Sequence, residues 1–238
     1  MTSTASYDSI ASIYDQYWGQ EFAEFAQDAF RTHLANALPG NAAVLDLCCG
    51  TGLLIAHLDA LGYRAFGVDE SLGMLSIASR SAPRAHLKQA DMAGFRWNTE
   101  FDAAVCLYNS VNHTRSLDHL CAALANVEKH LHPRGLFLFD YVSREAFETM
   151  WESNEEIDAE DGRGTVRYAY DRNTRRATCF IDHQRTAIRQ ISLEREQVYQ
   201  ALHYAGLAVV REAPMSGPAP IRGRRLILAG KAHRGETA

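Results

Sequence analysis

The sequence predicts an α/β fold in which helices cover both faces of a doubly wound, mostly parallel sheet. Between residues 43 and 141, short apolar runs alternate with longer amphipathic stretches, as in successive β-α-β units. A glycine turn follows the first apolar run, and polar residues follow the next three. The chain has 238 residues, of which 47% are hydrophobic, enough to bury a sizeable core. We therefore expect a single domain over residues 1–238.

The central part of this domain, residues 41–142, contains the expected parallel strands. Strands are predicted at 43–48, 64–69, 85–89, 101–107 and 135–141. Helices are predicted between them at 53–61, 71–81 and 117–131, the last with apolar residues on one face at a period of 3.6. Because parallel strands need crossover connections, these helices should cover both faces of the sheet.

The flanking segments have different patterns. Residues 1–40 are expected to form a helical cap, helical over 8–38, which folds over the site as a lid. Residues 163–191 alternate apolar and polar positions around an Asp171-Arg172-Asn173 turn, which predicts an inserted antiparallel β-ribbon with strands at 165–171 and 177–188. Residues 192–230 should close the domain with one helix and two strands, at 193–204, 207–211 and 225–229.

Composition argues against several classes of protein. The formal charge of −5 and the lack of a basic run before Arg222 disfavour a nucleic-acid partner. No stretch of eighteen apolar residues and no leader-like start occurs, so we expect a cytoplasmic chain without a membrane partner. The five cysteines lack the spacing of a disulfide framework or a zinc site, and His130 and His132 fit a solvated helix end. No metal is expected.

The most informative segment is the glycine turn after the first strand, Cys49-Gly50-Thr51-Gly52. Such a turn lets a ligand approach bare backbone and directs the N–H groups of a helix N-terminus towards it. A Gly-x-Gly turn alone is weak support, because tight connections between strands and helices need glycine anyway. Its significance depends on what the neighbouring strands present.

Polar residues follow the next three strands as well. Asp69 ends the second strand, Asp91 the third, and Tyr108-Asn109-Ser110 the fourth. The carboxyl ends of parallel strands meet at one edge of the sheet, where open α/β sheets bind their ligands. Each acid alone has a structural explanation, Asp69 as a helix N-cap and Asp91 as a turn residue. Structural roles for all of them together are improbable, so we expect a ligand at this edge.

These motifs, with Leu136-Phe137-Leu138-Phe139-Asp140 on the fifth strand, resemble those of class I S-adenosylmethionine-dependent methyltransferases. The resemblance covers roughly residues 7 to 230. It implies a Rossmann-like seven-stranded sheet whose last strand is antiparallel, and S-adenosyl-L-methionine as the cofactor. In that family the glycine turn supports the methionine moiety, the acid of the second strand holds the ribose, and an Asp-Met pair flanks the adenine. The implied cofactor-binding residues are Tyr14, Asp46, Cys48, Gly50, Thr51, Gly52, Asp69, Glu70, Met74, Asp91, Met92, Leu107 and Asn109.

A closer resemblance is to small bacterial methyltransferases that include the aminosugar N,N-dimethyltransferases of macrolide pathways. Residues 7–15, 109–113 and 217–228 carry it. It implies that Tyr7 and His113 line the acceptor pocket as catalytic residues. The sequence departs from these relatives at Asn112, where they have glycine, and after the fifth strand, where their Trp-Trp segment is replaced. The acceptor of those relatives, an aminosugar carried on a nucleotide, is therefore not assigned to this chain.

Other functions remain open. A dinucleotide dehydrogenase would have a third glycine where this chain has Ile55, and an exocyclic-amine nucleic-acid methyltransferase would have a Pro-Pro-aromatic run after Asn109. A small-molecule acceptor fits better, with methylation at nitrogen favoured over oxygen. The alternatives are a methyltransferase acting on a protein or peptide and a non-catalytic cofactor-binding protein that uses its ribbon as a protein-binding edge. The oligomeric state could be monomer or homodimer.

Overall fold

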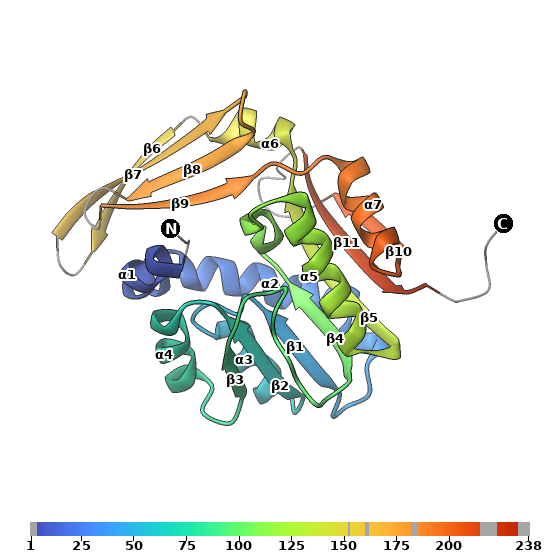
Figure 1. Ribbon diagram of the computed structural model, residues 1–238. Helices are drawn as coiled ribbons and strands as arrows, with labels where there is room; N and C mark the ends of the chain where they lie inside the picture. Colours follow the sequence, from blue (N-terminus) through green and yellow to red (C-terminus); the bar gives the residue numbers. More distant parts are fainter. Residues whose placement is uncertain (1–3, 152, 160–161, 182–184, 215–222, 233–238) are drawn as a thin grey trace.

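The computed structural model consists of a large sheet with helices on both faces and a smaller sheet lying across one end of it (Figure 1). It describes residues 4–151, 153–159, 162–181, 185–214 and 223–232. No helix among these residues is both long and apolar enough to cross a membrane. Part of the glycine- and proline-rich loop that we expected between the closing strands, residues 215–222, lies outside the described residues.

The large sheet has seven strands in the order β10-β11-β5-β4-β1-β2-β3. The five strands from β3 to β5 are parallel, while β11 pairs antiparallel with both β5 and β10, which confirms the predicted fold. Their bounds are Ala43–Leu47 (β1), Arg64–Asp69 (β2), His86–Gln89 (β3), Phe101–Cys106 (β4), Leu131–Val142 (β5), Leu207–Pro214 (β10) and Arg224–Lys231 (β11).

Strand β5 begins earlier than predicted, at Leu131 instead of residue 135. Leu131 pairs with Phe101, but the register then shifts so that Leu136 pairs with Ala103. The extra residues of β5 therefore form an irregularity that includes Pro133. Proline has no N–H for the ladder and is tolerated at such places, which is why the sequence alone indicated a later start.

Helices on the two faces bury separate halves of the core. Strand β1 alternates, with Leu45 packing on one side of the sheet and Val44 on the other. The first side is covered by α5 and α7, and the second by α2, α3 and α4. Fully burying one leucine-sized side chain contributes roughly 1.5–3 kcal/mol, so these two layers hold the sheet. The bounds are Leu53–Ala60 (α3), Leu72–Ser81 (α4), Leu117–His130 (α5) and Arg195–Tyr204 (α7).

The N-terminal segment is helical, as predicted, but it is divided. Helix α1 (Thr4–Tyr14) passes through a π-helical turn, η1 (Asp15–Gly19), into α2 (Gln20–His33), and a 3₁₀ turn, η2 (Ala35–Ala37), follows. The apolar stripe of α2 packs on the large sheet through Phe30, whereas α1 extends beyond the sheet and buries Ile10 against the smaller one. π-helical turns are rare and occur often at functional sites.

The predicted ribbon is a four-stranded antiparallel sheet in the order β6-β7-β8-β9. The antiparallel type is confirmed, but the segment 177–188, predicted as one strand, belongs to two strands that pair Ile181 with Thr186. The sheet also begins earlier than predicted, with strand β6, which follows helix α6. Residues 153–159 of β6 are mostly polar, so the sequence showed no alternation there. Bounds are Arg144–Met150 (α6), Ser153–Ala159 (β6), Gly162–Asp171 (β7), Arg176–Ile181 (β8) and Thr186–Ile191 (β9).

The glycine turn yields a prediction about stability. Gly52 has a φ of +79°, and a Cβ atom there would lie 2.7 Å from the Cβ of Ala78 on α4. Gly52→Ala should therefore lower the free energy of unfolding by more than about 1 kcal/mol, through strain and overlap together. Gly40→Ala is the matched control, because a Cβ there meets no atom within 4 Å. Urea denaturation of both variants measures the difference, and equal midpoints would contradict it.

Candidate active site

A cavity of about 630 Å³ lies at the carboxyl edge of the parallel strands, between that edge and the second sheet. This volume is within the range of small-molecule and cofactor sites. Helix α1, the strand ends and strands β8 and β9 all contribute to its wall. The predicted site residues that line it are Tyr7, Tyr14, Cys48, Gly50, Asp69, Glu70, Met74, Met92, Asn109 and His113.

The remaining predicted residues lie behind this wall. The side chains of Thr51 and Leu107 are buried, and Gly52 is packed against α4. Asp46 is buried near the end of β1, and Asp91 is held by other side chains. The strand ends that the sequence singled out border this cavity, but the sequence could not distinguish residues that line the wall from those that support it. The predicted residues outside the cavity lining are Asp46, Thr51, Gly52, Asp91 and Leu107.

The carboxylate of Asp69 joins the ends of β1 and β2. The N–H of Gly50 donates to Oδ2 of Asp69 at 2.9 Å, and the N–H of Ser71 donates to Oδ1 at 2.9 Å. Gly50 has a φ of +54° and Cys48 a φ of +61°, so the turn is left-handed at both positions. Ser71, and not Asp69, caps α4, because its hydroxyl accepts from the N–H of Met74. Asp69 thus fixes the shape of the glycine turn while facing the cavity.

Acidic groups crowd this end of the cavity. Burial and the proximity of Asp69 raise the pKa of Asp46 to about 8. Burial, with an interaction with Asp91, raises the pKa of Glu70 to about 7. Burial also raises the pKa of Asp69, although hydrogen bonds from the backbone oppose this. Desolvated carboxyl groups favour a ligand that carries positive charge or hydroxyl donors. The site therefore fits the sulfonium, ammonium and ribose of S-adenosylmethionine.

Asp91 lies in a network with two basic residues that the sequence did not indicate. Nε2 of His119 lies 2.9 Å from Oδ1 of Asp91, and the guanidinium of Arg115 contacts Oδ2. Partial burial raises the pKa of Asp91, but hydrogen bonds from Glu70, His119 and the Ala93 N–H outweigh it and bring the pKa to about 2. Arg115 and His119 line the cavity in place of Asp91. No sequence signal marked them, because both lie beyond the strand ends.

On the other side of the cavity, Tyr7 and His113 meet across 106 residues of sequence. The Tyr7 hydroxyl lies 3.2 Å from Nε2 of His113, and the two rings are edge to face at 5.5 Å. Burial lowers the pKa of His113 to about 4, although the backbone at Arg189 partly opposes it. Burial and the nearby Tyr14 raise the pKa of Tyr7. At neutral pH the pair is therefore an uncharged imidazole beside an uncharged phenol.

Helix α1 is attached next to this pair. Oδ1 of Asp8 accepts hydrogen bonds from the Ser71 hydroxyl at 2.6 Å and from the Gly73 N–H at 2.8 Å. The Ser9 hydroxyl lies 2.9 Å from that of Thr186 on β9. Residues 7–9 therefore connect the cavity, the N-terminus of α4 and the second sheet in turn. The N-terminal segment covers the cavity, and its opening and closing as a lid stays a prediction.

The wall beyond the fourth strand contains further residues that the sequence did not single out. Asn109, with a φ of +50°, donates from Nδ2 to Oε1 of Gln190 at 2.8 Å. Nε of Arg224 donates to Oδ2 of the buried Asp140 at 2.7 Å, and its guanidinium lies 4.6 Å from the ring of Tyr108. Nη2 of Arg224 has no hydrogen-bond partner among the described residues. Arg224 and Gln190 both line the cavity.

Comparison with known proteins agrees with this geometry. Residues 44–135 match a family model described as a methyltransferase domain. The chain is 30% identical over 164 residues to the dTDP-3-amino-3,4,6-trideoxy-alpha-D-glucopyranose N,N-dimethyltransferase of Streptomyces venezuelae, covering 67% of this chain and 68% of that protein. It is 29% identical over 245 residues to the dTDP-3-amino-3,6-dideoxy-alpha-D-glucopyranose N,N-dimethyltransferase of Streptomyces fradiae, covering 96% and 93%.

Solved structures share the fold. The CcbJ methyltransferase from Streptomyces caelestis aligns with a TM-score of 0.79 at 16% identity, over 98% of this chain and all of that one (100%). DesVI from Streptomyces venezuelae aligns with a TM-score of 0.74 at 23% identity, over 93% and 98%. The chain belongs to the class I S-adenosylmethionine-dependent methyltransferases. It is an enzyme of this class with S-adenosylmethionine as its cofactor, and it resembles the aminosugar N,N-dimethyltransferases.

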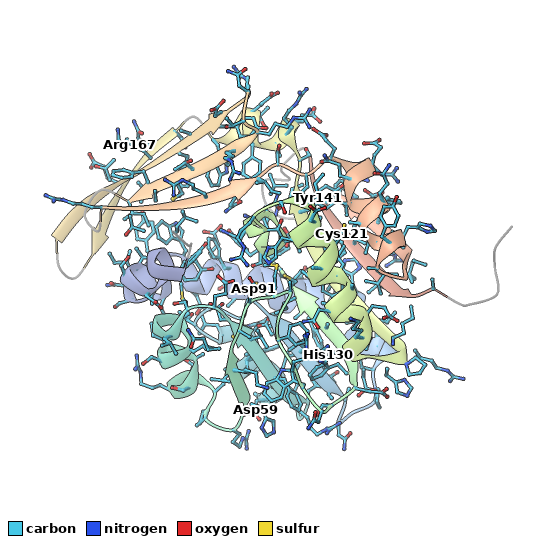
Figure 2. All side chains as sticks on the ribbon, viewed as in Figure 1. Asp59, Asp91, Cys121, His130, Tyr141 and Arg167 are labelled. Carbon is cyan, nitrogen blue, oxygen red and sulfur yellow. The ribbon has the colours of Figure 1, made fainter. Side chains whose placement is uncertain are left out.

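The position of Asp69 predicts an effect on cofactor affinity. Asp69→Ala should weaken binding of S-adenosylhomocysteine by about 1.5–3 kcal/mol, the range for a hydrogen bond to a charged group. Isothermal titration calorimetry measures this. Asp59→Ala is the control, because Asp59 pairs with Arg84 at the end of the molecule far from Asp91 (Figure 2). Unchanged affinity in Asp69→Ala would remove Asp69 from the cofactor site.

Proposed function

We propose that this enzyme transfers the methyl group of S-adenosylmethionine to the nitrogen of a small-molecule amine. The observation that carries the proposal is the pair of Tyr7 and His113, which face the cavity as uncharged hydrogen-bonding groups. A neutral amine has a lone pair to attack with and N–H groups to donate. Nε2 of His113 and the Tyr7 hydroxyl bond each other and can exchange that bond for one to the amine, so that Nε2 accepts an N–H and the phenol turns the lone pair towards the methyl donor.

The cofactor, when bound, supplies an electrophilic methyl group on a positively charged sulfur. The nitrogen lone pair of the acceptor forms the new N–C bond as the C–S bond breaks, and the electrons of that bond remain on sulfur. The resulting ammonium group then loses its proton to solvent. Because the pKa of His113 is about 4, its main role is to orient the amine instead of holding that proton. Alignment of the reacting atoms is then the chief contribution of the protein.

The residues at the strand ends would hold the cofactor. Gly50 would offer bare backbone to the methionine moiety, and Asp69 and Glu70 would accept hydrogen bonds from the ribose. Met74 and Met92 would supply apolar surface for the adenine together with Arg115 and His119, which Asp91 holds in place. Asp46, Thr51, Gly52 and Leu107 support this wall from behind. Cys48, Tyr14 and Asn109 would complete the lining beside the cofactor.

The acceptor side of the cavity is closed by the second sheet. Trp18, Trp151 and Tyr168 line it, and so does Arg224, whose buried Nη2 has no hydrogen-bond partner among the described residues. The names of two relatives describe aminosugars linked to dTDP, whose phosphates are anions of the kind that a guanidinium binds. A cavity of about 630 Å³ suits a small molecule better than a folded protein. These features support an amine on a small molecule that carries an acidic group.

A panel assay tests the proposal. The enzyme is incubated with S-adenosylmethionine and with amines, phenols and carboxylic acids, including dTDP-3-amino-3,6-dideoxyglucose, and products are identified by mass spectrometry. We expect methylated amines. If only phenols or acids are methylated, nitrogen is not the methylated atom. If none of these acceptors leads to S-adenosylhomocysteine, the acceptor is not a small-molecule amine of this kind.

His113 should affect turnover more than cofactor binding. His113→Ala should lower kcat/KM by roughly 10²-fold, the size of the loss when reacting atoms are misplaced by about 1 Å. His113→Gln keeps a hydrogen-bond acceptor and should recover part of that loss, because orientation is the main role. Steady-state kinetics with the best amine of the panel measures both, with cofactor affinity as the control. Wild-type turnover in His113→Ala would remove the residue from the reaction.

The lowered pKa of His113 also predicts a dependence of stability on pH. In the unfolded chain the imidazole titrates near 6.5, whereas in the folded protein it titrates near 4. The unfolded chain therefore binds more protons between these values, so stability falls as the pH drops through this window. Between pH 8 and pH 5 the wild type should lose up to about 2 kcal/mol more than His113→Gln. Urea denaturation at both pH values measures this, and equal losses would contradict it.

A further inference from the structure

Asn112, which precedes His113, is the most completely bonded side chain near the cavity. It is fully buried, with 0% of its surface exposed. Its Nδ2 donates to the carbonyl of Val142 and to the carbonyl of Ile191, each at 2.8 Å, and its Oδ1 accepts from the N–H of Val142 at 2.9 Å. Both amide hydrogens are therefore used. A buried amide that uses all of these groups fixes its surroundings, and removing it weakens the pairing of buried backbone groups.

The three bonded backbone groups belong to two residues, Val142 and Ile191, which lie in different sheets. Val142 is the last residue of β5 in the large sheet, and Ile191 is the last residue of β9 in the second sheet. The N–H of Leu193 also donates to the Val142 carbonyl, at 3.3 Å. Asn112 itself lies on a 3₁₀ turn, η3 (Ser110–His113), which connects β4 to α5. One side chain thus joins the two sheets and the turn, where the second sheet lies over the large one (Figure 1).

This junction determines where His113 stands. Within the turn, the N–H of Asn112 donates to the Asn109 carbonyl at 2.9 Å, and the N–H of Thr114 donates to the Val111 carbonyl at 3.3 Å. These bonds shape the turn, but they do not connect it to the strands. Two side chains link η3 to the end of β5: Asp140, which accepts from the N–H of Asn109 at the start of the turn, and Asn112, one residue from His113. The large sheet carries the glycine turn, so the Asn112 link, which is the nearer of the two to His113 in the sequence, helps to set the distance between His113 and the methyl donor.

We propose that Asn112 is a positioning residue that holds His113 and the acceptor-side sheet in register with the cofactor edge of the large sheet. The inference rests on the proposed function, in which His113 orients the acceptor. A misplacement of about 1 Å can lower a rate by about 10²-fold. Asn112 does not line the cavity, so its loss should affect turnover and leave cofactor affinity intact.

The test compares Asn112→Ala, His113→Ala and the double variant. With the best amine of the panel, or dTDP-3-amino-3,6-dideoxyglucose, Asn112→Ala should lower kcat by roughly 10²-fold. Affinity for S-adenosylhomocysteine should stay within about threefold, equivalent to roughly 0.7 kcal/mol. The double variant should be no slower than His113→Ala, because a residue that acts through His113 has nothing further to lose. Multiplied losses would overturn the proposal, as would wild-type turnover in Asn112→Ala.

A spectroscopic readout needs no acceptor. The imidazole of His113 is titrated by ¹⁵N NMR in the complex with S-adenosylhomocysteine. In Asn112→Ala the loosened turn admits water, so the pKa of His113 should move from about 4 towards 6.5. Asn112→Asp, which keeps the acceptor for the Val142 N–H but loses both donors, should shift it in the same direction. An unchanged titration in both variants would overturn the positioning role.

The control separates positioning from lost stability. His130 is also buried, and its ring nitrogens bond the Asn126 carbonyl at 2.7 Å and the Trp97 N–H at 3.2 Å. It lies at the end of the large sheet away from the second sheet (Figure 2). His130→Ala should therefore lower the midpoint of unfolding and leave kcat unchanged.

If Asn112→Ala does not bind S-adenosylhomocysteine, Asn112→Ser replaces it in each of these measurements. Wild-type turnover in His113→Ala would contradict the proposed function, whereas a slow His113→Ala beside a normal Asn112→Ala contradicts this inference alone.

Discussion

The buried carboxylate of Asp140 ties three parts of the chain together at the carboxyl edge of the large sheet. It has no exposed surface, and its Oδ2 accepts from Nε of Arg224 on β11 and from the N–H of Asn109. A buried charge is costly unless it is paired, so β11 must deliver its arginine to this place. The same carboxylate holds Asn109 in its left-handed conformation. The turn that carries His113 begins at that point.

The two sheets divide the work of the site. The large sheet supplies the glycine turn and the acidic residues at the strand ends. The hydrogen bond from the Gly50 N–H to the Asp69 carboxylate fixes the turn to the end of β2. The second sheet and α1 supply an apolar cover, where Ile10 packs with Val166 and Ile188. Excluding water strengthens every polar interaction within the cavity. Methyl transfer needs alignment more than acid–base strength, and a cavity covered by a second sheet suits it.

Charge is distributed unevenly along this cavity. Near the glycine turn, burial raises the pKa values of carboxyl groups, as at Asp46 and Glu70. Near the second sheet, burial lowers the pKa of His113 and raises that of Tyr7. The first arrangement favours a positively charged ligand, and the second keeps a hydrogen-bonding pair uncharged. An in-line displacement on a positively charged methyl donor requires a nucleophile with a free lone pair, which an uncharged amine supplies in the proposed function.

The sequence by itself determined the parallel core, because a buried strand and an amphipathic helix each have a period that is visible within ten residues. It also indicated the strand ends that carry Gly50 and Asp69. It did not indicate β6, whose residues lack alternation, or the reversal between β8 and β9. It could not separate Asp91 from the residues that line the cavity, nor find Arg224, His119 or the bonds of Asn112 to β5 and β9. These features depend on which distant segments of the chain come into contact, and local periodicity does not predict such contacts. Only the packing of the second sheet and β11 against the large sheet decided them, since buried polar groups must find partners wherever the fold brings them together.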